Sequence, residues 1–121
     1  MAYSEARESC NLLEFDDSAL DELREDLGDA FVARLVGSCA ADVADILEKM
    51  PATYAAEDEK MTRALAHKLR GLCAQFGALE AERAASETET CGSDKIEHRL
   101  VWLRDAATRA LARFERIRDG K

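Results

Sequence analysis

The chain of 121 residues carries a formal net charge of −8, with a hydrophobic fraction of 47% and a charged fraction of 35%. This length suits one domain with its own core, and the negative charge argues against nucleic acid as a partner, because a phosphate backbone needs a basic surface. No apolar run approaches the ~20 residues that cross a bilayer, and no signal-peptide pattern opens the chain, so we expect a cytoplasmic protein with no membrane partner.

The N-terminal part of the chain predicts an arm followed by a short helix. Residues 1–15 lack a sustained hydrophobic period, so we expect a flexible N-terminal arm in front of a folded domain over residues 16–121. Residues 16–18 supply N-cap candidates for a short helix, and Gly28 is expected to end it. We expect this short helix to cover one end of the domain.

Four longer amphipathic segments follow. Over residues 30–50 apolar side chains recur in heptad-like steps, and Pro51 is expected to end that helix, because the residue before a proline disfavours the α region. Negative charge at residues 57–59 favours the start of the next helix. An Ala- and Glu-rich segment covers 78–89, and the clearest heptad run covers 96–117. The pattern predicts an all-α fold, an antiparallel up-down-up-down four-helix bundle with a short N-terminal capping helix.

The second long segment carries a histidine on its outer face. A helical projection gathers five apolar residues into one stripe that should face the core: Met61, Leu65, Leu69, Leu72 and Phe76. His67 points about 200° away from Leu65, so the core does not explain it. Its neighbours on the outer face are basic or small: Lys60, Arg63, Ala64, Arg70, Gly71 and Ala74. A solvent-facing imidazole in this setting is equipped to carry a phosphoryl group and to admit a bulky partner.

The motif around this histidine is specific. His67 is followed by Leu69, Arg70 and Gly71, and Gly77 stands six residues after the first glycine. This pattern resembles the histidine-containing phosphotransfer (HPt) family, which has a His, then Leu or Ile, Lys or Arg, Gly, and a second Gly at these spacings. Arg70 stands where Lys is commoner, so the cation is kept with a different geometry.

The resemblance implies a phosphoprotein of a two-component phosphorelay. His67 would accept a phosphoryl group from a receiver-domain aspartate and pass it to another receiver. Neutral imidazole is a nucleophile near pH 7, and we expect attack through Nε2. The implied partners are response-regulator receiver domains and a hybrid histidine kinase. No cofactor or metal of its own is expected, because Mg²⁺ belongs to the receiver. The chain has no Gly-rich phosphate loop, so neither ATP binding nor kinase activity is expected.

Supporting roles are predicted for four side chains near the imidazole. Arg70, together with Lys68 and Arg63, would offset the charge of the transferred group. Gln75, two turns further along the helix, would hydrogen-bond the imidazole and hold its orientation.

The predicted receiver-binding surface lies over the same helical face. Gly71, one turn beyond the histidine, would leave room for the receiver, since a glycine inside a helix costs roughly 1 kcal/mol against alanine and needs a reason. The full predicted surface comprises Lys60, Arg63, Ala64, Gly71 and Ala74, with Phe31 and Leu35 on the neighbouring helix. Phe31 lies about 100° off its own stripe, so it either anchors the interface or packs under the short helix.

Two other interpretations of the motif remain open. In the first, the chain is a non-catalytic HPt-like binding module that regulates a receiver or histidine kinase by docking. In the second, it is a helical adaptor with a coincidental motif. Only a transfer assay separates these readings from phosphotransfer.

The remaining histidine and the cysteines indicate no further chemistry. His98 also points away from its core stripe, but no glycine lies one turn away, so we read it as a solvated surface residue. Cys39 and Cys73 fall at or near core faces and are interpreted as packing residues. A di-iron site needs Glu-x-x-His pairs, and neither histidine has a glutamate three residues before it.

Overall fold

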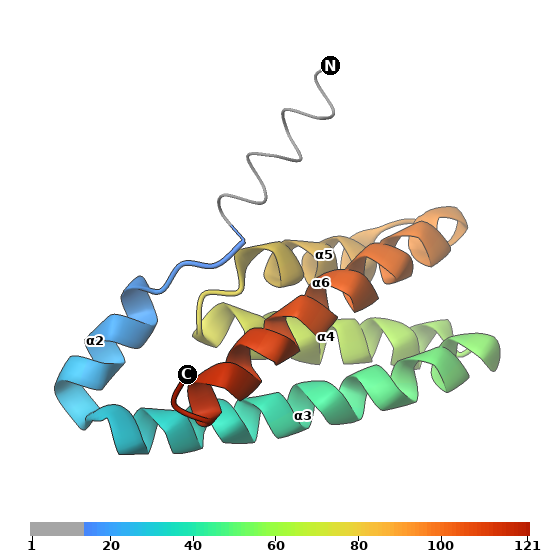
Figure 1. The fold of residues 1–121 in the computed structure, drawn as a ribbon. Helices are drawn as coiled ribbons and strands as arrows, with labels where there is room; N and C mark the ends of the chain where they lie inside the picture. The colour runs from blue at the N-terminus through green and yellow to red at the C-terminus, as the bar shows by residue number, and fades with distance from the viewer. Residues whose placement is uncertain (1–13) are drawn as a thin grey trace.

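The computed structural model describes residues 14–121 of the chain. The elements in this range are α2 (Ser18–Leu27), α3 (Asp29–Ala55), α4 (Glu59–Gln75), α5 (Leu79–Thr90), the 3₁₀ turn η1 (Ser93–Lys95) and α6 (Ile96–Arg118) (Figure 1). The extended structure in this range is an isolated bridge between Phe15 and Ala78. The prediction of an all-α fold is therefore confirmed. No helix in the described range has the length and apolarity needed to span a bilayer.

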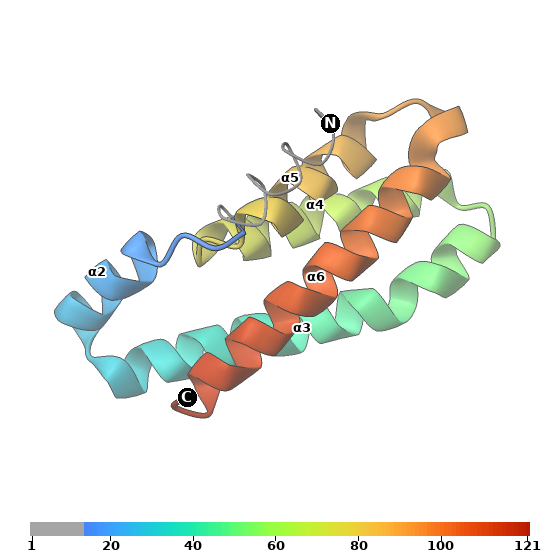
Figure 2. The ribbon, with the colours of Figure 1, turned by 45° about the horizontal axis from the view of Figure 1, so that its top comes forward.

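The five α-helices pack around one hydrophobic core. α4 packs against α3 and α5, and α6 packs against the same two helices (Figures 1 and 2). α2 packs on α3 and lies at one end of the molecule, where Leu20 is its buried residue. In the Ala-rich α5, three alanines are buried, and their small side chains allow neighbouring helices to approach closely.

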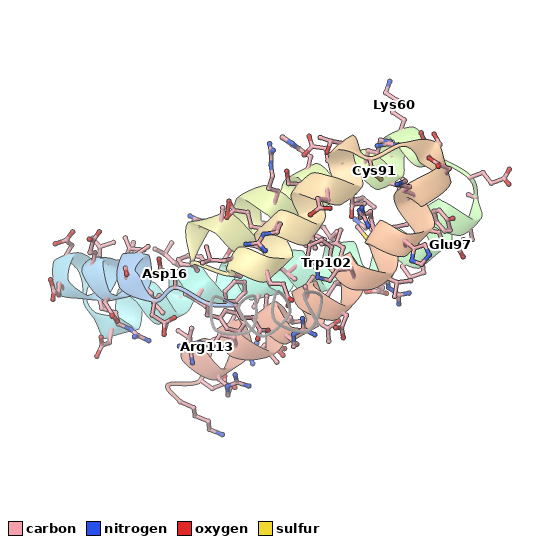
Figure 3. The ribbon with its side chains drawn as sticks, turned by 90° about the horizontal axis from the view of Figure 1, so that it is seen from above. Asp16, Lys60, Cys91, Glu97, Trp102 and Arg113 are labelled. Atoms are coloured by element: carbon pink, nitrogen blue, oxygen red, sulfur yellow. The ribbon has the colours of Figure 1, made fainter. Side chains whose placement is uncertain are left out.

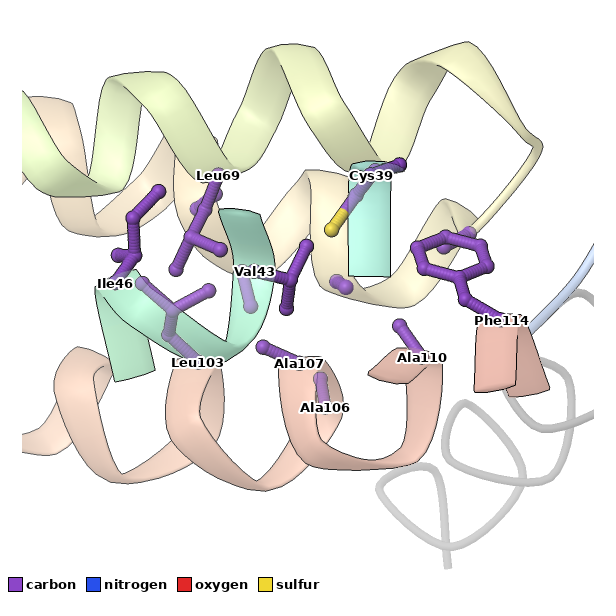
Figure 4. Close-up of a cluster of buried hydrophobic side chains, with 14 of the residues drawn as sticks. Cys39, Val43, Ile46, Leu69, Leu103, Ala106, Ala107, Ala110 and Phe114 are labelled. Carbon is purple, nitrogen blue, oxygen red and sulfur yellow. The ribbon is translucent and has the colours of Figure 1, made fainter. Parts of the chain in front are cut away.

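The core is built from aliphatic side chains and small residues of the long helices. Figure 4 shows Cys39, Val43 and Ile46 of α3 facing Leu69 of α4, with Leu103, Ala106, Ala107, Ala110 and Phe114 of α6 on the other side. Toward one end, the rings of Phe76 and Phe114 meet edge to face, with centroids 6.0 Å apart and an interplanar angle of 73°. The heptad positions predicted for the last helix are thus the ones that fill the core.

The prediction that Pro51 ends the first long helix is wrong. α3 continues one turn beyond it, because Tyr54 in that turn packs against the core. The turn is closed by backbone bonds from Glu57 N to Tyr54 O (2.9 Å) and from Asp58 N to Thr53 O (3.2 Å). Glu57 takes a φ of 61°, the left-handed conformation that ends a helix in this way. Packing and this end motif outweigh the one hydrogen bond that a proline cannot donate.

The predicted apolar stripe of α4 is partly wrong. Leu65, Leu69 and Phe76 are buried, but Met61 is 49% exposed. Leu72 is half-buried, and the other buried residues of the helix are Thr62, Ala66 and Cys73. Because α4 packs against two helices, its buried face is wide and centred about 50° from Leu65. The histidine lies about 150° from this centre, so it stays on the face opposite the core.

Helix α4 ends at Gln75, and the chain turns at Gly77 before α5 begins. Gly77 has a φ of +75°, and a Cβ there would overlap the carbonyl oxygen of Asp16. Asp16 N donates to Gly77 O at 2.7 Å, and Leu79 N donates to Glu14 O at 2.9 Å. Of the expected N-terminal arm, residues 1–13 lie outside the described range, whereas Glu14 and Phe15 pair with Leu79 and Ala78 beside this turn. The second glycine of the motif is therefore a site of close backbone approach.

Candidate functional site

His67 lies near the middle of α4 with 58% of its side chain exposed. The exposure follows from the sequence, because the residues that face the core recur at 3–4-residue intervals and this position falls between them. The orientation predicted from the helical projection is therefore confirmed. The imidazole is open to a partner from the solvent side.

Glu89, on the last turn of α5, is the hydrogen-bond partner that sequence reasoning missed. Its Oε1 lies 2.8 Å from Nδ1 of His67. An ionised carboxylate can only accept, so Nδ1 carries the proton and donates it. In the neutral ring, Nε2 is then left unprotonated, with its lone pair free. Nε2 is also the nitrogen through which the sequence-based chemistry expects the ring to react.

A signal for this acid exists in the sequence. The turn between α4 and α5 lies at Gly77, and ten residues on either side of it stand His67 and Glu87. Two helices that fold back at this turn bring the end of α5 level with the histidine, so an acid within one turn of Glu87 is a candidate partner. Glu89 meets this condition.

Arg70 stands one turn after the histidine, beside both members of the pair. Its Nη2 lies 3.3 Å from Nδ1 of His67, and its Nε lies 3.6 Å from Oε2 of Glu89. Since the Nδ1 proton points to Glu89, this arginine cannot donate to the same nitrogen, and its contact is electrostatic. Oε2 of Glu89 is buried and, within residues 14–121, has no hydrogen-bond partner. Because its guanidinium lies beside the ring, Arg70 is placed to approach an anion carried by the imidazole.

Arg63 does not face the imidazole as an open cation. Its Nη1 donates to the backbone oxygen of Glu89 at 2.9 Å and reaches that of Thr88 at 3.5 Å. Its Nε lies 3.4 Å from Oε2 of Glu59. The side chain is thus committed to the C-terminal end of α5, where carbonyl groups favour a cation. The guanidinium that does lie beside the ring is that of the next arginine along the helix, Arg70.

The other predicted polar residues occupy separate places. Lys68 is exposed and lines a groove of about 470 Å³ between α3 and α4. Lys60 extends outward at the start of α4, at the end of the molecule where Cys91 follows α5 (Figure 3). Gln75 is exposed eight residues after the histidine, about 12 Å along the helix axis. That distance is too long for a hydrogen bond, so the predicted contact from Gln75 to the imidazole is replaced by Glu89.

The small residues of the predicted surface leave open space. Gly71 is exposed, and a Cβ built on it would meet no described atom within 4 Å beyond its own turn. Ala64 and Ala74 are exposed on the same helix. Because these three residues are small, the surface around His67 is unobstructed, and another protein can approach the imidazole.

Phe31 is exposed, whereas the helical projection left open whether it anchors an interface or packs under the short helix. Its ring is 42% exposed, with the guanidinium carbon of Arg34 5.6 Å from its centroid, and Leu35 is half-buried. The Sγ of Cys39 contacts Leu72 O at 3.4 Å, so these two residues lie at the same level of α3 and α4. From that contact Phe31 lies about 20 Å along the bundle from the imidazole, so it belongs to the periphery of the candidate site.

Comparison with protein-family models, with curated proteins and with solved structures gives no match, so a functional assignment rests on the geometry of this chain.

Proposed function

We propose that the protein is a histidine phosphotransfer protein of a two-component phosphorelay. It accepts a phosphoryl group from a receiver-domain aspartate on His67 and passes it to another receiver. The observation that carries the proposal is the hydrogen bond of 2.8 Å between Nδ1 and Glu89, which leaves Nε2 of an exposed ring unprotonated. The motif that resembles the HPt family supports the same assignment.

The proposed frame is an antiparallel up-down-up-down bundle of α3 to α6, with α2 as a cap. Short connections at residues 56–58, 76–78 and 91–95 support this arrangement, as does the cycle of packed pairs α3–α4, α4–α5, α5–α6 and α6–α3. Such connections join neighbouring helices that run in opposite directions. The frame supplies a rigid element that holds the nucleophile.

The proposed reaction is an in-line displacement at phosphorus. The lone pair of Nε2 attacks the phosphorus of the aspartyl phosphate, the N–P bond forms, the P–O bond breaks, and the aspartate leaves as a carboxylate. The ring gains positive charge, while its Nδ1 proton remains on the hydrogen bond to Glu89. This carboxylate offsets the new charge on the ring, and Arg70 offsets the charge of the phosphoryl oxygens. The Mg²⁺ needed for transfer would be bound by the receiver.

The reverse step delivers the group to a second receiver. A phosphorylated ring that keeps its Nδ1 proton is a good leaving group, so the same hydrogen bond serves both directions. The partners are therefore response-regulator receiver domains and a hybrid histidine kinase that carries one, and the proposal places the protein with them in the cytoplasm. The chain itself would need no nucleotide.

The test is transfer from a panel of receiver domains phosphorylated with labelled phosphate. We expect the wild-type protein to take label from at least one receiver, in a form that is acid-labile and alkali-stable, as a phosphoramidate is. His67→Gln should abolish the label, and the matched variant His98→Gln should keep it. If a receiver binds without transfer, the protein is a docking module instead. Label that persists in His67→Gln would refute the proposal.

A further inference from the structure

The C-terminal end of α5 is held by a side chain from α4. The last four carbonyls of a helix lack partners within it. In α5 the carbonyl of Glu87 accepts from Cys91 N at 2.9 Å. The next two carbonyls, those of Thr88 and Glu89, accept from Nη1 of Arg63 at 3.5 and 2.9 Å. Arg63 therefore caps a helix to which it does not belong.

This cap and the imidazole bind the same residue. Arg63 and His67 are four residues apart on α4, so they lie one turn apart on one face. The arginine bonds the backbone oxygen of Glu89, and the histidine bonds its side-chain Oε1. The other carboxylate oxygen, Oε2, has no hydrogen-bond partner in the described part of the chain. Apart from the imidazole and the ion pair of 3.6 Å with Arg70 Nε, the position of the carboxylate depends on the backbone from which it extends.

We propose that Arg63 is a positioning residue for His67. By holding the backbone at Glu89, it keeps the carboxylate on Nδ1 and so keeps Nε2 unprotonated. The effect of Arg63 on the tautomer of His67 rests on the contacts given above. Its consequence for phosphoryl transfer rests on the proposed function. The sequence predicts that this arginine offsets the charge of the phosphoryl group, whereas its contacts in the structure are with the backbone that carries Glu89.

A nearby ion pair supplies a matched control. Arg99 of α6 lies 3.2 Å from Glu87 Oε1, so it also ties the last turn of α5 to a neighbouring helix. It bonds a side chain and does not bond the backbone at Glu89. Arg99→Met and Arg63→Met each remove one arginine from the same turn. Only Arg63→Met should release the carboxylate from the ring.

The experiment measures the tautomer of His67 by ¹⁵N NMR of its ring nitrogens, at about pH 8, above the ordinary imidazole pKa. Glu89→Ala gives the ratio of Nδ1–H to Nε2–H forms in a released ring. Arg63→Met should lower this ratio about three- to tenfold toward that endpoint, the effect of one weakened hydrogen bond. Arg63→Lys, which keeps the charge, should restore part of the ratio. Arg99→Met should match wild type.

Two results would overturn the proposal. One is a wild-type ratio in Arg63→Met when circular dichroism shows a folded protein. The other is an equal fall in Arg99→Met, which would indicate general loosening of the turn. If Arg63→Met does not fold, Arg63→Gln, a good helix former too short to reach the carbonyl, is judged by the same ratio.

Transfer from a phosphorylated receiver is measured in parallel and should slow about three- to tenfold in Arg63→Met. If wild type takes no label from any receiver, the proposed function fails. The tautomer ratios still decide the role of Arg63 in that case.

Discussion

Replacing Gly77 with alanine should lower the free energy of unfolding by about 3–4 kcal/mol. Gly77 has a φ of +75°, where an L side chain costs roughly 1–2 kcal/mol. The new Cβ would overlap the carbonyl of Asp16, so residues 14–16 must move away from the turn. That movement breaks the bonds from Asp16 N to Gly77 O and from Leu79 N to Glu14 O, at about 1 kcal/mol each.

The first glycine of the motif is the matched control. Gly71 lies inside α4, and a Cβ there meets no described atom within 4 Å outside its own turn. Gly71→Ala should therefore stabilise the protein by about 1 kcal/mol, the difference in helix propensity. Urea denaturation followed by far-ultraviolet circular dichroism measures both variants. A loss below about 1 kcal/mol in Gly77→Ala would refute the reasoning, because the left-handed φ alone costs that much.

Docking, thiol ionisation and salt dependence each provide a separate measurement. Gly71→Gln should slow transfer at least about tenfold by obstructing the receiver, without loss of thermal stability, and wild-type transfer would place the interface elsewhere. Burial raises the pKa of Cys39 and of Cys73 to about 12. Because the folded protein holds these thiols neutral, they contribute fully to the free energy of unfolding below about pH 8.5. Above that pH the thiols of the unfolded chain ionise, and the contribution is lost as the pH rises toward 12. Urea denaturation at about pH 7 and at about pH 10 measures how far the free energy of unfolding falls between them. That fall should be smaller in the variant with both cysteines replaced by alanine than in wild type. Raising NaCl from about 50 to about 500 mM should lower the rate of transfer less than about threefold, and a tenfold fall would show that surface cations steer docking.

The helices were predictable because their signals are local, and the errors arose where tertiary packing decides. Apolar spacing of 3–4 residues located each long helix, since only one face of a helix meets the core. Pro51 was misjudged because the turn after it gains contacts with the core through Tyr54. Met61 was misjudged because the buried face of α4 is centred between two neighbouring helices rather than on Leu65.

The same distinction between local signals and tertiary packing applies to the residues of the candidate site. The exposure of His67 and the open space at Gly71 depend on one helix and its 100° step, and both were predicted. The acceptor for Nδ1 depends on the register of α5 against α4, which the turn at Gly77 sets. The helical pattern alone did not settle whether the chain bends there, so Glu89 was not assigned and Gln75 was given its role.

The cations that the sequence gathers around His67 are largely compensated in the folded chain. Arg63 is bonded to a carboxylate of its own helix and to the end of α5. Arg70 lies 3.6 Å from the carboxylate that also binds the imidazole. Lys68 lines a groove that holds two aspartates. The charge that a receiver would meet is therefore much lower than the count of basic residues indicates, and the chain as a whole is acidic.

If the proposed function holds, recognition of a receiver should depend on shape more than on long-range attraction. The open surface over Gly71 and the exposed ring of Phe31 are features that a partner can fit without paired charges. In the proposed relay, Arg70 would contribute once the phosphoryl group has arrived, because an anion on the ring would compete with Glu89 for its guanidinium at a distance of one helical turn. Under the proposed function, docking and charge compensation would thus be separate events that depend on different residues. For this reason a change at Gly71 should alter the approach of the receiver, whereas a change at Glu89 should alter the reactivity of the ring after the receiver has docked.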